Sequence, residues 1–93
     1  RLVGLNPKIS FLYNLLGLIL VGQGKNDEAI EYYEKGIRIK PDYAMVYNNL
    51  GAVYKSKKNY LKAETYFEKS IKLDKIESEE LIVGLRKYKK NII

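Results

Sequence analysis

The sequence contains neither cysteine nor histidine among its 93 residues. Without cysteine, the chain can form no disulfide and no thiolate metal site, and this composition fits an intracellular protein. Without histidine, it lacks the side chain most often used as a general base and as a metal ligand. No glycine-rich phosphate loop or metal-ligand cluster replaces them. We therefore predict no catalytic activity, no cofactor and no metal site.

Long apolar runs are missing as well. The most apolar stretch, residues 11–21, has eleven residues, whereas a membrane-spanning helix needs roughly 20. No signal-peptide pattern precedes it. We interpret this stretch as a core helix, and we expect a cytoplasmic protein with no membrane partner. Because the chain opens at Arg1 rather than Met, we expect an excerpt of a longer protein or a processed product.

The net charge of +6 is spread along the chain. Its densest cluster comprises Arg86, Lys87, Lys89 and Lys90. A nucleic-acid-binding surface should concentrate its cations on one face. A solvated lysine-rich surface therefore explains the charge better, and nucleic acid is a less favoured partner.

What the chain does contain is a pattern that recurs every 34 residues. Chemically matched residues coincide when the sequence is shifted by this period. The clearest pairs are Pro7 and Pro41, Tyr13 and Tyr47, Asn14 and Asn48, Leu16 and Leu50, Gly17 and Gly51, Ala29 and Ala63, and Tyr33 and Phe67. A period of this length is typical of solenoids built from helix–turn–helix units. We predict an all-α fold in which such units stack into an α–α superhelix.

The repeated residues resemble the tetratricopeptide repeat (TPR) family. The second copy reads Tyr47-x2-Leu50-Gly51-x2-Tyr54, followed by Ala63-x3-Phe67. The first copy has the same spacing from Tyr13 to Tyr33 and closes on Pro41. The departures are tyrosine in place of the usual tryptophan, Leu20 in place of a tyrosine, and Lys75 in place of the closing proline.

This frame predicts a single domain over residues 1–93. Residues 1–7 are the tail of a preceding repeat, residues 8–41 and 42–75 are two complete repeats, and residues 76–93 are a capping helix. The alternative for the last segment is the start of a third full repeat. A separate last helix over residues 77–92 would place Leu81, Leu85, Tyr88 and Ile92 on one stripe. Lys58 occupies the place of Gly24, so it is strained if that turn needs a positive φ.

The matching residues are interpreted as scaffold. Gly17 and Gly51 lie within predicted helices, where glycine costs about 1 kcal/mol relative to alanine. Such a cost is understandable if a neighbouring helix must approach closely. Tyr33 and Phe67 would then fill the adjacent space, and we assign them no binding role.

The resemblance implies a binding groove on the concave face. In TPR proteins this face is lined by first-helix residues that point away from the core, and peptides or helical segments of other proteins lie in it. The matching positions here are Phe11, Asn14, Leu18, Val21, Met45, Asn48, Asn49, Ala52 and Lys55. The amides of Asn48 and Asn49 could pair with a peptide backbone, although simple solvation is an equal alternative. Only Asn49 matches the carboxylate clamp of one TPR subfamily, so we do not expect that clamp.

These observations favour a protein-interaction scaffold that binds a peptide or helix of a partner protein. The apolar strip of Phe11, Leu18 and Val21 is expected to contact an upstream repeat or a partner, and self-association through this face of the first helix is the alternative. Another is a substrate-recruiting arm of a larger protein, such as a transferase.

Overall fold

The computed structural model describes residues 6–92, with the side chains of all of these except 7, 85 and 88–92. Over this range the chain forms α1 (Pro7–Gly22), α2 (Asn26–Ile39), α3 (Ala44–Ser56) and α4 (Tyr60–Ile92). The predicted all-α helical repeat is confirmed. The tail predicted for residues 1–7 lies almost entirely outside the described residues.

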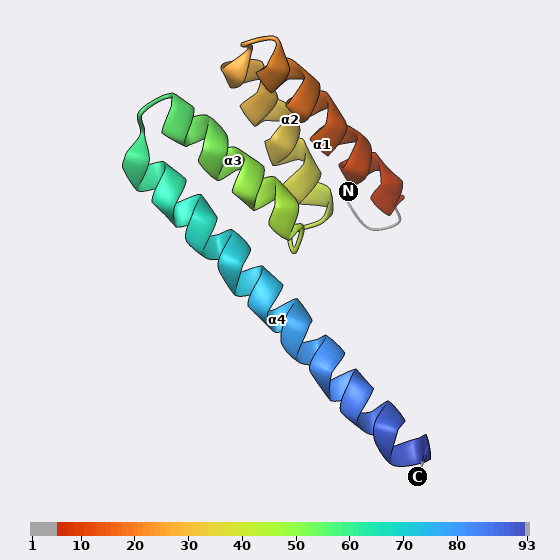
Figure 1. The fold of residues 1–93 in the computed structure, drawn as a ribbon. Coiled ribbons are helices and arrows are strands. Elements are labelled where there is room, and N and C mark those ends of the chain that lie inside the picture. Colours follow the sequence, from red (N-terminus) through yellow and green to blue (C-terminus); the bar gives the residue numbers. More distant parts are fainter. Residues whose placement is uncertain (1–5, 93) are drawn as a thin grey trace.

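The helices form two antiparallel hairpins in series (Figure 1). The first hairpin pairs α1 with α2, the second pairs α3 with α4, and α3 also packs against α2. Asn6 caps α1, since its side-chain oxygen accepts a hydrogen bond from the Lys8 amide at 2.9 Å. Pro7 follows in the first turn, where its fixed φ is compatible with a helix.

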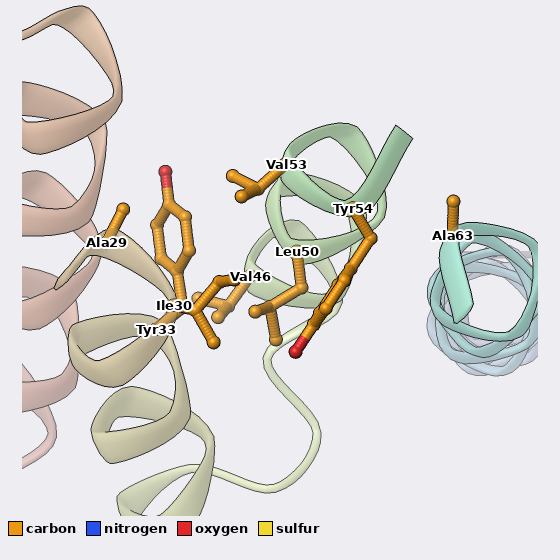
Figure 2. Packing of buried hydrophobic residues seen from close by; sticks show 8 residues of the cluster. All are labelled: Ala29, Ile30, Tyr33, Val46, Leu50, Val53, Tyr54 and Ala63. Carbon is orange, nitrogen blue, oxygen red and sulfur yellow. The ribbon is translucent and has the colours of Figure 1, made fainter. Parts of the chain in front are cut away.

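The core lies between the two hairpins. Val46 and Leu50 of α3 are fully buried, and Val53 is 2% exposed. They pack with Tyr33 from α2 and with Tyr54 and Ala63 of the second hairpin. Figure 2 shows Tyr33 standing between the α2 ribbon and the side chains of α3. The three α3 residues are spaced four and three positions apart, so one stripe of this helix supplies most of the core.

Within each hairpin, an aromatic ring lies directly on a helical glycine. A Cβ atom added at Gly17 would lie 2.3 Å from Cε1 of Tyr33, and one at Gly51 would lie 2.6 Å from Cδ1 of Phe67. No side chain fits at such distances. The two glycines are therefore required by the close approach of the ring, as the repeat pattern predicted.

Tyrosines and lysines cover the side of each hairpin. The rings of Tyr54 and Tyr66 stack with centroids 5.5 Å apart and an interplanar angle of 8°. The Nζ atom of Lys62 lies 4.9 Å above the Tyr54 ring. In the first hairpin, the rings of Tyr13 and Tyr32 are tilted by 36°. The second hairpin thus has the more closely parallel pair.

The prediction of a separate helix starting at residue 77 is wrong, because α4 continues without a break from Tyr60 to Ile92. There is neither proline nor glycine between residues 60 and 83 to interrupt it. At the corresponding place in the first repeat, Pro41 follows the end of α2, whereas the second repeat has Lys75. From Asp74 onward every described side chain is exposed, and α4 packs against α3 alone. A capping role for residues 76–93 stays a prediction.

The ring-on-glycine contact predicts the effect of adding a methyl group. Gly17→Ala should lower the free energy of unfolding by about 2 kcal/mol, because overpacking against the buried Tyr33 ring outweighs the better helix propensity of alanine. Gly84→Ala is the control, since a Cβ there meets nothing within 4 Å, and it should leave the main unfolding transition unchanged. Urea denaturation of the three chains measures this, and equal midpoints would contradict the contact.

The turn between α3 and α4 carries a strained residue. Lys58 has φ 64°, close to the φ of 77° at Gly24 in the first turn, so the strain suggested by the sequence is confirmed. Lys58→Gly should raise stability by about 0.5–1 kcal/mol, because the left-handed conformation costs a lysine more than glycine loses in chain entropy. The reverse change, Gly24→Lys, should lower it. Thermal melts check both, and a lower melting temperature for Lys58→Gly would contradict the argument.

Candidate functional site

A pair of asparagine side chains connects the first helices of the two hairpins. Nδ2 of Asn49 donates to Oδ1 of Asn14 at 2.8 Å. Nδ2 of Asn14 in turn points to Sδ of Met45 at 3.6 Å, a weak contact. Asn14 is only 1% exposed, so the prediction that it lines an open groove is wrong. Because α3 covers Asn14, its amide forms hydrogen bonds between α1 and α3 and does not face solvent.

A small cavity lies beside this asparagine pair. It brings together four of the predicted groove residues, Leu18 and Val21 from α1 and Asn49 and Ala52 from α3. Its volume is about 110 Å³, and its lining is mostly apolar. Leu18 is 43% exposed and Val21 is 37% exposed, so the cavity opens onto the side of the molecule that α1 and α3 share.

The cavity is also lined by three residues that were not among the predicted groove residues, namely Tyr33, Val53 and Ser56. Tyr33 is 1% exposed. No buried side-chain oxygen of the described residues lacks a hydrogen-bond partner, so the Tyr33 hydroxyl is not an unsatisfied buried group, and Tyr33 lies at the cavity wall. Burial raises the pKa of Tyr33 above its usual value, so the hydroxyl stays protonated and able to donate at neutral pH. The sequence contains one hint of this role: Phe67 occupies the equivalent position, so the hydroxyl is the difference between the two repeats.

The other predicted groove residues do not join this cavity. Asn48 is exposed on a different side of α3, beside Ser70, Ile71 and Asp74 of α4. Met45 lines that second region and also contacts Asn14. The side chains of Phe11 and Lys55 are exposed and line neither cavity. The row predicted along α3 is therefore divided between two faces.

The described residues offer no sign of a different kind of site. No group of three or more acidic side chains within residues 6–92 is placed to hold a metal ion. In the same range, no helix combines the length and the apolar character needed to span a bilayer.

Comparisons with known proteins agree with the architecture. A family profile described as TPR repeat matches residues 17–58, and one described as tetratricopeptide repeat matches residues 44–75. The chain belongs to the TPR family. Its repeats are the units of a helical scaffold of the kind used in protein interactions. No curated protein sequence matches the chain.

The chain is also similar to solved structures of TPR proteins. A crystal structure of MamA matches with a TM-score of 0.75 and 34% identity, over 83% of this chain and 45% of that one. A second crystal structure of MamA protein matches with a TM-score of 0.70 and 34% identity, over 83% of this chain and 42% of that one. The chain therefore spans less than half the length of either structure.

The different surroundings of two equivalent asparagines predict different costs of mutation. Asn14→Ala should lower the free energy of unfolding by about 1–3 kcal/mol, because it removes a buried amide and the acceptor of Asn49. Asn48→Ala, the matched control at the equivalent position, should change it by less than about 0.5 kcal/mol. Chemical denaturation of both variants decides this, and similar costs at the two sites would contradict the assignment.

Proposed function

We propose that the face shared by α1 and α3 binds a peptide segment of a partner protein, with one side chain of that peptide in the cavity between Leu18 and Ala52. TPR membership supports protein interaction in general. The finer proposal is carried by one observation, namely the apolar cavity at whose wall the otherwise buried Tyr33 presents its hydroxyl. A ligand in the cavity that supplied an acceptor could take a hydrogen bond from this hydroxyl.

The size of the cavity suggests which side chain it accepts. Its volume of about 110 Å³ is below the roughly 150 Å³ of an engineered cavity that holds benzene. One aliphatic side chain of moderate size suits this space better than an aromatic ring. Leu18, Val21 and Ala52 form the apolar walls, and burial of such a side chain contributes about 1.5–3 kcal/mol.

The polar groups at the cavity suggest how the peptide backbone is held. The Tyr33 hydroxyl can donate to a peptide carbonyl. Asn49 uses its Nδ2 group to hold Asn14, which fixes the amide and leaves its Oδ1 atom to accept from a peptide N–H. One donor and one acceptor beside an apolar cavity match one residue of an extended chain. This arrangement favours an extended peptide over a helix, whose backbone groups are already paired.

A role as the substrate-recruiting arm of a larger protein remains compatible with this site, because the same groove would hold the recruited segment. No observation on the described residues favours that role separately.

The proposal predicts two separable effects on binding. Peptides selected from a random library on the intact chain are titrated by fluorescence anisotropy against each variant. Leu18→Glu should weaken binding at least about 30-fold, because it places a charge at the apolar wall. Tyr33→Phe should weaken it about 3- to 10-fold through the loss of one hydrogen bond, while the melting temperature stays the same or rises.

Asn48→Ala serves as the control, because Asn48 lies outside the cavity, and it should bind like the parent chain. Selected peptides that bind Leu18→Glu and Tyr33→Phe as tightly as the parent would place the binding face elsewhere. Loss of binding by Asn48→Ala alone would do the same.

A further inference from the structure

The side of α1 that points away from the second hairpin carries an apolar stripe. Leu12, Leu16 and Ile19 are 55%, 42% and 57% exposed. Their equivalents one repeat later, Val46, Leu50 and Val53, are 0%, 0% and 2% exposed. The α3 residues are buried because α3 packs on the first hairpin. The α1 stripe is therefore the same docking surface, and none of the described residues docks on it.

The opposite end of the molecule shows the complementary surface. In the first hairpin, α3 covers Asn14 and Tyr33, which are 1% exposed, and partly covers Ile37. The equivalents in the second hairpin are Asn48, Phe67 and Ile71. There Asn48 is exposed, Phe67 is partly exposed and Ile71 is 66% exposed. This end face of α3 and α4 thus repeats the surface that receives a first helix.

The chain's own C-terminal segment does not suit this end face. In the 34-residue frame, Glu80, Gly84 and Lys87 stand at the places of Val46, Leu50 and Val53. Two charged residues and a glycine would replace the three residues that fill the core. In addition, α4 continues straight past Asp74 and extends away from the two hairpins (Figure 1). Residues 80–87 therefore do not supply the side chains that the end face would need.

We propose that the occupant of the end face is a second copy of the chain, docked head to tail. The stripe of Leu12, Leu16 and Ile19 on one copy would pack on the end face of another, as α3 packs on α1 and α2 within each copy. The same kind of interface already exists inside the chain, and its two halves recur without a partner among residues 6–92. It is independent of the peptide site proposed above.

This contact differs from the self-association considered from the sequence, which used Phe11, Leu18 and Val21. Phe11 and Leu18 stand at the places of Met45 and Ala52, so they would border the stacked contact, whereas Val21 stands at the place of Lys55 and would stay outside it. A head-to-tail contact is heterologous, so each copy added leaves one free surface at either end. Assembly is then open-ended and continues the superhelix from one molecule to the next.

Two of the positions at which the contact between copies differs from the internal one bear on its strength. Glu64 stands at the place of Ile30, which is 9% exposed in the internal interface. Leu15 stands at the place of Asn49, so Asn48 would lack the amide partner that Asn14 has. Both differences weaken the contact between copies, which makes the assembly dependent on concentration.

Sedimentation velocity and light scattering over a range of concentrations test the proposal. The parent chain should form species of increasing mass at high micromolar concentration. Leu16→Glu blocks one surface and Ile71→Glu blocks the other. Both residues are exposed in the single chain, so circular dichroism should show normal folding. Each variant alone should be monomeric, but an equimolar mixture should form 1:1 dimers and nothing larger, because one intact surface of each kind remains.

A gain of association provides a second measurement that misfolding cannot imitate. Glu64→Ile restores the residue of the internal interface and should move assembly to concentrations at least about tenfold lower. Glu31→Lys, at an exposed position of α2 outside the proposed contact, should leave assembly unchanged.

Several outcomes would overturn the proposal. A parent chain that stays monomeric at several hundred micromolar would leave the end face without this occupant. A closed dimer that Leu16→Glu and Ile71→Glu both abolish, and that mixing does not restore, would indicate a symmetric contact. Dissociation by Val21→Glu would assign assembly to the groove side, and dissociation by Leu81→Glu alone would assign it to the distal part of α4.

Discussion

The structure depends on the contact between an aromatic ring and a bare helical backbone. Tyr33 lies on Gly17 and Phe67 lies on Gly51 so closely that no Cβ atom fits between them. This approach sets the distance between the two helices of each hairpin. It also fixes where the far end of the ring reaches. In the first hairpin, that end carries a hydroxyl at the wall of the cavity between α1 and α3. The scaffold contact and the candidate binding site therefore share one residue.

The 34-residue period predicted the fold because it repeats residues whose size determines how closely two helices can pack. Glycine, alanine and large aromatic residues at fixed offsets describe a close helix pair whatever surrounds it. The same logic identified the strain at Lys58, since the place of Gly24 in the repeat required a positive φ. Local geometry and spacing were sufficient for these inferences, and all of them concern contacts within one hairpin.

The inferences that failed concern contacts between neighbouring units. Asn14 and Asn48 are the same residue at the same repeat position, yet α3 buries the first and nothing covers the second. A helical period tells which face a residue occupies, but it does not tell whether another unit stands opposite. The continuous α4 has a similar origin. The repeat frame suggested a break near Lys75, whereas the local absence of proline and glycine favours an uninterrupted helix. The repeat pattern assigns Tyr33 to the scaffold alone, because it treats Tyr33 and Phe67 as equivalent aromatic residues and takes no account of the tyrosine hydroxyl.

The parallel stack of Tyr54 and Tyr66 has a spectroscopic consequence. The protein has no tryptophan, so its near-ultraviolet absorption and emission come mainly from tyrosine. Two rings 5.5 Å apart and inclined by 8° are close enough for their electronic transitions to couple. The tilted pair of Tyr13 and Tyr32 has a different coupling geometry. The two hairpins thus carry distinct intrinsic chromophores, and local opening of one half can be followed optically without an added label.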